Sequence, residues 1–157
     1  MLKLYKIGEQ KQYWETWGNG DGSHTVHWGI LGTEGETKTI RKSLLKNPVK
    51  IIQKEVDQMV DIGFAPIETH FICMIEYKVD GMGNNADLEK RYRLEERMNE
   101  TLGWTGLGNC DGGSIGSGTM EVCNLVVDFD LAKEIIINNL KGTEFENYTR
   151  IYDEENP

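Results

Sequence analysis

Six basic side chains lie within residues 37–54, a segment that contains no acidic residue. They are Lys38, Arg41, Lys42, Lys46, Lys50 and Lys54. Clustered cations neutralise phosphate groups and steer the approach of a polyanion, so the segment is a candidate nucleic-acid surface. Lysine is equally the ordinary residue of a solvated helix face, and acidic residues return from Glu55 onward. The sequence leaves both interpretations open.

Aromatic residues form a second candidate group ahead of the basic segment. They are Tyr13, Trp14, Trp17 and Trp28. Such rings stack on bases or sugars in proteins that bind single strands. In small β-rich domains they more often fill the core, and we expect core positions for this set.

A glycine-rich run, GLGNCDGGSIGSG, occupies residues 106–118. Repeated glycine lets backbone N–H groups approach a phosphate. No Gly-Lys-Ser/Thr follows the run, however, and the next residues have the pattern of a strand rather than a helix. We therefore expect a flexible or bulged strand and loop, not a nucleotide site.

The remaining reactive residue types form no catalytic or metal-binding pattern. The three His residues lack the spacing of a metal pair. Cys73 and Cys123 fall in expected strands and are predicted core residues, whereas Cys110 is expected to be more exposed. Asp128 and Asp130 flank a predicted helix start, where we expect a capping role, with Asp130 well placed for it. We predict no enzyme activity, no metal and no cofactor.

Composition excludes several classes of protein. The 157 residues include 17 basic and 26 acidic ones, for a formal net charge of −9, and 38% are hydrophobic, which argues against a disordered chain. No apolar run approaches the roughly 20 residues of a membrane span. No signal peptide is visible, and an odd count of three Cys suits a reducing compartment. We therefore expect a cytoplasmic protein without a membrane partner.

Charge divides the chain into two parts. Residues 1–68 hold nine basic and nine acidic residues and sum to zero, whereas residues 69–157 hold eight and seventeen and carry the whole −9. Gly63 and Pro66, a helix stop and a turn residue, stand at the break. We predict two small domains, residues 1–67 and residues 69–157.

The first domain has the pattern of four strands and one main helix. Alternating or aromatic-rich runs predict strands at residues 2–7, 12–17, 25–31 and 36–41, with a Gly-rich hairpin loop at residues 18–23. Asn47 as N-cap and Pro48 in the first turn predict a helix that ends at Gly63. Its expected apolar stripe consists of Val49, Ile52, Val56, Met59 and Val60.

The acidic second domain reads as an α+β unit of the ferredoxin-like type. Strands are predicted at residues 70–79, 119–127 and 148–152, and helices at residues 86–102 and 131–140. If residues 106–111 are also extended, the order is β-α-β-β-α-β.

Residues 4–67 resemble a WGR domain, a module named for a Trp-Gly-Arg tripeptide. The shared features are the aromatic strand YWETW at residues 13–17, the run VHWGILGTEGET at 26–37, the basic strand KTIRK at 38–42 and a helix ending in IGF at 62–64. The resemblance implies an antiparallel sheet with one main helix. Residues 106–118 give the second half a fainter similarity to ferredoxin-like domains of bacterial proteins.

The resemblance implies a function only in part. WGR domains of poly(ADP-ribose) polymerases contact DNA ends through the Trp and Arg of the tripeptide, and the family also occurs in bacterial proteins. Trp28 keeps its place here, which makes it the candidate exception to the core assignment, but Ile30 holds the Arg position. A charged planar fork is thus replaced by a hydrocarbon. The polymerase domain has no counterpart in the second half.

Taken together, these features predict a non-enzymatic interaction protein of the bacterial WGR type. The first alternative is weak nucleic-acid binding through Trp28, Lys38, Arg41, Lys42, Lys46 and Lys50. The second is a dedicated basic protein partner bound by the acidic half. A ferredoxin-like sheet could also pair with a second copy, so a homo-oligomer is a further expectation.

Overall fold

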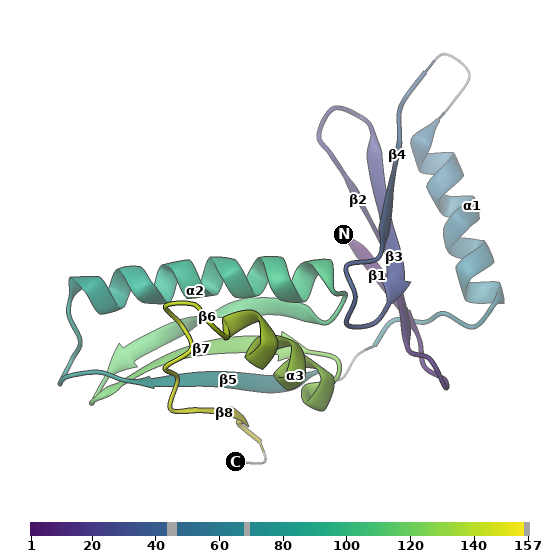
Figure 1. The fold of residues 1–157 in the computed structure, drawn as a ribbon. Coiled ribbons are helices and arrows are strands. Elements are labelled where there is room, and N and C mark those ends of the chain that lie inside the picture. Colours follow the sequence, from purple (N-terminus) through teal and green to yellow (C-terminus); the bar gives the residue numbers. More distant parts are fainter. Residues whose placement is uncertain (44–46, 68–69, 156–157) are drawn as a thin grey trace. The chain divides into compact units, whose positions relative to one another are not determined.

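The computed structural model describes residues 1–43, 47–67 and 70–155 (Figure 1). The chain divides into two compact units, an N-terminal unit of Met1–Glu68 and a C-terminal unit of Thr69–Pro157. Within the described residues the fold is α+β, with two four-stranded antiparallel sheets and three helices, as the sequence predicts.

The N-terminal sheet is a meander of four consecutive strands. They are β1 (Leu2–Lys6), β2 (Gln12–Gly18), β3 (His24–Ile30) and β4 (Glu36–Ile40), in the order β1-β2-β3-β4 (Figure 1). All pairs are antiparallel. The predicted strands agree with these bounds to within one residue at most ends, because alternating side chains and Gly-rich turns mark them locally.

Both ends of helix α1 (Pro48–Asp61) are set by local chemistry. The side chain of Asn47 accepts a hydrogen bond from the backbone N–H of Val49, as expected of an N-cap. At the other end Gly63 has a φ of +95°. Its N–H donates to Val60 O, and the N–H of Phe64 donates to Met59 O, which together form a Schellman motif. The predicted helix ends are confirmed.

The apolar stripe of α1 is narrower than the sequence predicts. Ile52 is buried, and Val56 and Met59 pack partly buried against the core of Leu4, Trp14, Val26 and Phe64. Val49 and Val60, by contrast, are 63% and 53% exposed, so these two members of the expected stripe are not buried. Successive residues of an α-helix are rotated by about 100° about its axis. Val49 and Val60 are therefore rotated by about 60–80° from Ile52, in the same direction, and lie outside the part of the helix surface that faces the sheet.

The C-terminal unit has the predicted β-α-β-β-α-β order (Figure 1). Its elements are β5 (Phe71–Lys78), α2 (Asn85–Trp104), β6 (Gly108–Gly116), β7 (Thr119–Val126), α3 (Phe129–Leu140) and β8 (Arg150–Asp153). The sheet order is β6-β7-β5-β8, with every pair antiparallel. This connection of strands and helices is the ferredoxin-like split.

The cap of α3 differs from the prediction. The helix begins at Phe129, and Asp128 rather than Asp130 is its N-cap, with its carboxylate accepting from the N–H of Leu131 at 3.2 Å. Asp130 lies in the first turn, where a carboxylate still faces the positive end of the helix dipole. An aspartate is a favourable N-cap residue at either position. Asp128 is the N-cap because its backbone is extended, as the N-cap position requires.

The glycine-rich run forms a bulged strand, as expected, but a longer one than residues 106–111. Strand β6 continues to Gly116 in a hairpin with β7, and its register shifts between Cys110 and Gly112. A side chain at Gly113 would place a Cβ 2.4 Å from the carbonyl oxygen of Glu121 and 2.9 Å from Glu95 of α2. Glycine thus permits the close contact between α2 and β6.

The core of the C-terminal unit lies on one side of its sheet. Residues of β7 alternate between buried and half-buried, and Met120, Val122 and Val126 are fully buried. Leu94, Met98 and Leu102 of α2, with Ile136 and Leu140 of α3, are also fully buried. Cys73 belongs to this core as predicted, whereas Cys123 is only half-buried because its position in β7 points to the other side.

No helix in the described part of the chain is long and apolar enough to cross a membrane.

Candidate functional site

Trp28 is held on the face of the N-terminal sheet that packs against α1. It lies on β3, opposite Trp14 of β2 and Glu36 of β4. Its side chain is partly buried against the core, and the Nζ atom of Lys38 lies 5.5 Å from its ring centroid. Trp14 and Tyr13 are core residues as predicted, whereas Trp17 and Trp28 are half-buried.

The glycine after Trp28 is required by a close approach of two backbone segments. A Cβ at Gly29 would lie 2.7 Å from the Cα of Gly35 and 3.2 Å from the phenol oxygen of Tyr13. The turn between β3 and β4 therefore folds back onto β3 only if residue 29 has no side chain. This packing explains physically why a glycine follows the tryptophan.

A buried polar network lies on the opposite face of the same sheet. His27 Nδ1 lies 2.7 Å from Glu15 Oε1, and its Nε2 lies 2.8 Å from the phenol oxygen of Tyr13 and 2.6 Å from the carbonyl oxygen of Glu34. The Tyr13 hydroxyl donates to the carbonyl of Thr33. Burial, together with Glu15 and Glu34, raises the pKa of the Tyr13 phenol, which keeps this donor protonated.

The hydrogen bonds of this network connect β2, β3 and the β3–β4 turn. Because Tyr13 donates elsewhere and a carbonyl only accepts, Nε2 of His27 must carry a hydrogen. The His27 side chain is 1% exposed and that of Glu15 4%, so the imidazole is shielded from a reactant in solution. Sequence reasoning missed this group, although the hairpin register that places Glu15 opposite His27 would have indicated it.

A mostly apolar cavity of about 510 Å³, here called the Trp28 cleft, lies beside Trp28. Its lining comes from β2, β3, β4, α1 and the segment after α1: Gln12, Tyr13, Trp14, Trp28, Gly29, Ile30, Lys38, Glu55, Gln58, Met59, Ile62 and Phe64. Ile30 and Ile62 are 43% and 54% exposed, so hydrocarbon is accessible at the cleft. Both charged groups in the lining belong to one ion pair, in which Lys38 Nζ lies 2.9 Å from Glu55 Oε1.

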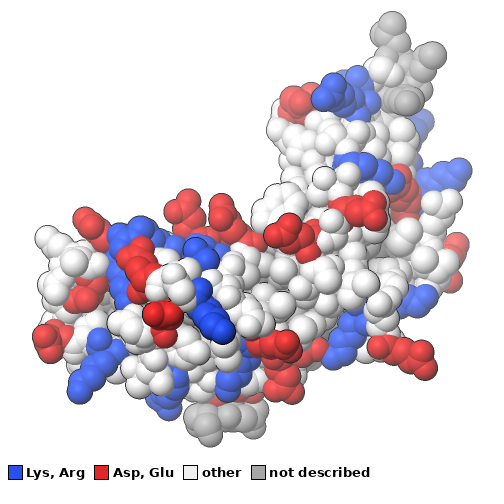
Figure 2. All heavy atoms as spheres, viewed as in Figure 1, with Lys and Arg blue, Asp and Glu red and all other residues white. Residues whose placement is uncertain are grey.

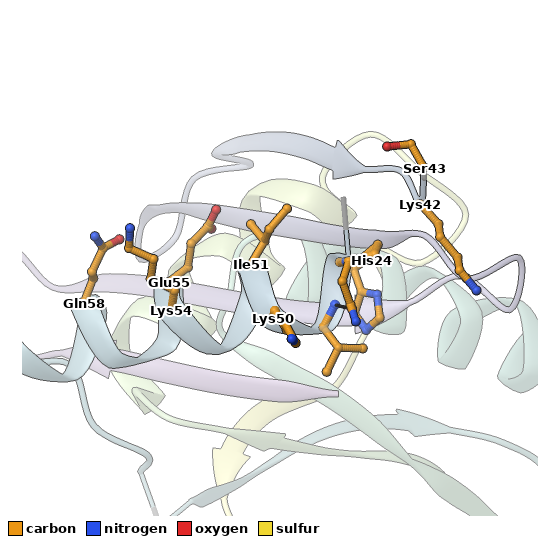
Figure 3. Close-up of a pocket in the computed structure, with 12 residues that line it drawn as sticks. His24, Lys42, Ser43, Lys50, Ile51, Lys54, Glu55 and Gln58 are labelled. Atoms are coloured by element: carbon orange, nitrogen blue, oxygen red, sulfur yellow. Dashed lines mark hydrogen bonds between the residues drawn. The ribbon is translucent and has the colours of Figure 1, made fainter. Parts of the chain in front are cut away.

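A second cavity of about 1,100 Å³, here called the lysine groove, borders the first half of α1 (Figure 3). It is lined by Gly22, His24, Lys42, Ser43, Asn47, Pro48, Val49, Lys50, Ile51, Lys54, Glu55 and Gln58. Within the described residues Lys42, Lys50 and Lys54 make no ion pair. The first turn of α1 contains no acidic residue, so its N–H groups add to the positive potential.

The predicted nucleic-acid residues that the structure describes are distributed over three adjoining cavities, all of which have Glu55 in their lining. Trp28 and Lys38 line the cleft, whereas Lys42 and Lys50 line the groove together with Lys54. Arg41 lines a neighbouring hollow of about 520 Å³ with Lys38 and Lys42. Lys46 lies outside the described residues.

Two of the predicted cations are close to carboxylates. The ammonium group of Lys38 on β4 forms an ion pair with the carboxylate of Glu55 on α1. Asp21 lies near Arg41: hydrogen bonds from Ser23 chiefly lower the pKa of Asp21, and the charge of Arg41 lowers it further. By contrast, Lys42, Lys50 and Lys54 of the groove form no ion pair with any described residue.

The remaining His, Cys, Asp and Glu residues were compared with the requirements of a metal site and of a reactive thiol within residues 1–43, 47–67 and 70–155. Among the described residues no three His, Cys, Asp or Glu side chains lie close enough to hold a metal ion. The three cysteines are free thiols, and burial raises the pKa of Cys110 to about 11, which leaves little thiolate at neutral pH.

Neither a known protein family, nor a curated protein, nor a solved structure matches this chain.

Proposed function

We propose that this protein is a non-enzymatic interaction protein of the WGR-like type, whose N-terminal unit holds a partner protein in the Trp28 cleft. The observation that carries the proposal is a mostly apolar cavity of about 510 Å³ with Ile30, at the expected Arg position, and Ile62 accessible in its lining. Cavities of this size and character hold apolar or aromatic groups.

The chemistry of the cleft selects the kind of partner. Trp28, Met59 and Phe64 offer dispersion contacts to a ring or a branched aliphatic chain, as the anchor pockets of interfaces do. Lys38 and Glu55 cancel one another in charge, so the lining favours neither a polyanion nor a polycation. An uncharged peptide segment with an exposed Leu, Phe or Trp side chain fits these features.

A peptide selection tests this proposal with a matched pair of variants. Ile62 and Val60 are 54% and 53% exposed and lie two residues apart, but only Ile62 lines the cleft. Peptides selected from a displayed random library on the full chain should share one large apolar anchor. Ile62→Asp should weaken their binding at least tenfold in calorimetry, whereas Val60→Asp should leave it unchanged. Failure to enrich any peptide, or equal effects of both variants, contradicts the proposal.

Nucleic-acid binding through the lysine groove is the second candidate function. One observation favours it: Lys42, Lys50 and Lys54 line a single cavity next to the N-terminus of α1 and lack ion pairs among the described residues. Phosphate groups of a backbone would complement these charges, and the affinity would depend steeply on salt because bound counterions are released.

Fluorescence anisotropy with labelled single strands and duplex ends at low salt tests this second function. Lys50→Ala and Lys54→Ala should each weaken binding and reduce the slope of log K against log salt by about 0.7–0.9 per lost contact. Lys78→Ala, an exposed lysine of the C-terminal unit, serves as the control. Absence of binding at 20 mM salt, or equal loss in the control, rules out the groove as a nucleic-acid surface.

A further inference from the structure

Three cavities of the N-terminal unit adjoin one another along the side of α1 that carries Glu55. Glu55 lines all three: the Trp28 cleft, the neighbouring hollow and the lysine groove. Lys38 lines both the cleft and the hollow, and Lys42 lines both the hollow and the groove. The cavities therefore form one continuous surface between β4 and α1, here called the α1–β4 track, with Ile62 at one end and Lys50 at the other.

The two ends of the α1–β4 track differ in chemistry. At the end formed by the cleft, apolar side chains such as Ile62 are accessible, and both charged groups of the lining belong to one ion pair. At the other end Lys50 and Lys54 extend from α1, and Lys42 lies across the groove from them (Figure 3). These three lysines form no ion pair with any described residue. A ligand that complements the track has an apolar group at one end and negative charge at the other.

The outer edge of β4 borders the same track. Within residues 1–43, 47–67 and 70–155, no backbone hydrogen bond joins Glu36–Ile40 to any segment other than β3. The opposite edge of the sheet differs, because the N–H and the carbonyl of Tyr5 on β1 are both bound by the backbone of Ala65. The edge of β4 thus offers N–H and C=O groups to an extended chain, which is how peptides add to a sheet.

We infer that the α1–β4 track binds an extended peptide of a partner protein, with one apolar side chain in the Trp28 cleft and acidic side chains at the lysine end. The apolar anchor is that of the proposed function, on which this inference rests, and the flanking acidic residues are the addition. A nucleic acid complements the track less well, because its phosphates repeat along the whole strand whereas the unpaired cations gather at one end.

Helix geometry gives the spacing between the anchor and the acidic residues. Lys54 and Lys50 precede Ile62 by eight and twelve residues, which corresponds to about 12 and 18 Å along α1 at a rise of about 1.5 Å per residue. An extended chain rises about 3.3 Å per residue, so acidic residues about four and six positions from the anchor reach these lysines. Even spacings also place the acidic side chains and the anchor on the same side of an extended peptide.

Peptides selected on the full chain for their apolar anchor, and lengthened at both ends, test this inference by fluorescence anisotropy. Two Glu residues stand four and six positions before the anchor in one peptide and after it in another, because either chain direction fits the track. One of the two should bind about three- to tenfold more tightly than the same peptide with Gln at those positions, at 50 mM salt. Most of this gain should disappear at 500 mM salt. Moving the Glu pair to the third and fifth positions should abolish it.

Variants of the chain assign the gain to the groove. Lys50→Glu combined with Lys54→Glu should remove the advantage of the Glu peptide and leave the affinity for the Gln peptide unchanged. Lys78→Glu, at an exposed lysine of the C-terminal unit, is the matched control and should change neither affinity.

The outcomes separate this inference from the proposed function. Binding through the anchor with no gain from Glu at any position overturns the inference and leaves the Trp28 cleft as a peptide site, whereas a chain that binds no anchored peptide removes both. Equal gains in both registers of the Glu pair, or an equal loss in Lys78→Glu, also overturn it. If a single-stranded oligonucleotide binds through Lys50 and Lys54 while the Glu pair adds nothing, these lysines belong to a nucleic-acid surface instead.

Discussion

At the scale of single residues, two glycines permit the close approach of β3 and the turn that follows it. Gly29 and Gly35 bring β3 and the following turn into direct backbone contact, with Tyr13 closing the third side. The ring of Trp28 lies in the lining of the cleft, with Lys38 Nζ 5.5 Å from its centroid. Packing within the N-terminal unit thus explains why residue 29 is a glycine, independently of any ligand.

Gly29→Ala should therefore destabilise the protein. The added Cβ would lie 2.7 Å from the backbone of Gly35, so the turn has to shift, at a cost of about 1–3 kcal/mol. Gly103→Ala is the control: a Cβ there meets nothing within 4 Å and replaces a helical glycine of α2, which should stabilise by about 0.5–1 kcal/mol. Urea unfolding measures both, and equal effects would contradict the packing described for Gly29.

Cys110 should be a poor nucleophile despite its partial exposure. Burial is the main cause that raises the pKa of Cys110 to about 11. Because only the thiolate reacts, alkylation of Cys110 at pH 7.5 should be at least tenfold slower than alkylation of glutathione. The rate should rise about tenfold per pH unit up to that pKa, because a raised pKa keeps the thiol neutral until the pH approaches it. Iodoacetamide labelling read by peptide mass spectrometry measures this, with Cys110→Ser as the blank; labelling as fast as glutathione at pH 7.5 refutes it.

At the scale of elements, helix termini and close packing position the C-terminal unit. A capping box of Asn84 and Asp87 begins α2, and the glycines of β6 let this helix lie directly on the strand. Arg97 then joins α2 to the end of α3 through the side chain and carbonyl of Asn139. These contacts join both helices on the core side of the sheet.

The cap of α3 gives a direct test at this scale. Asp128→Ala removes the side-chain acceptor of the Leu131 N–H and should cost about 1 kcal/mol or more of unfolding free energy. Asp130→Ala, two residues on, removes only a dipole interaction and should cost about 0.3–1 kcal/mol. Thermal and urea unfolding compare the two variants, and a larger loss in Asp130→Ala would restore the original sequence-based assignment of the cap.

At the scale of the whole molecule, the net charge describes neither unit. The N-terminal unit combines a lysine groove with a neutral cleft, and the excess of acidic residues belongs to residues 69–157. Even there, Lys and Arg side chains lie among the Asp and Glu side chains on the face that Figure 2 shows. Arg93 pairs with Glu144 and Arg91 with Glu95. A basic protein partner for this half stays a prediction.

Residues 1–67 and 70–157, expressed separately, should each unfold cooperatively. The N-terminal unit has its own apolar cluster around Leu4, Trp14, Val26, Ile52 and Phe64, and the C-terminal unit has its own helix-covered sheet. Small domains with a contiguous core fold independently. Sigmoidal thermal transitions in circular dichroism are the expected result. A fragment without a transition would mean that the boundary does not separate two folding units.

The sequence alone determined the features that depend on near neighbours in the chain. Hairpin turns, the N-cap Asn47, the stop at Gly63 and the α+β order follow from local backbone preferences and from side-chain periodicity.

Tertiary structure decided what depends on the meeting of distant segments. It paired Lys38 with Glu55, left Val49 and Val60 in solvent, and assembled Tyr13, Glu15 and His27 in one network. The basic segment could be predicted as a list of cations. Which of them has a carboxylate partner depended on the meeting of β4 and α1, because ion pairing depends on distance in space and not on spacing in the sequence.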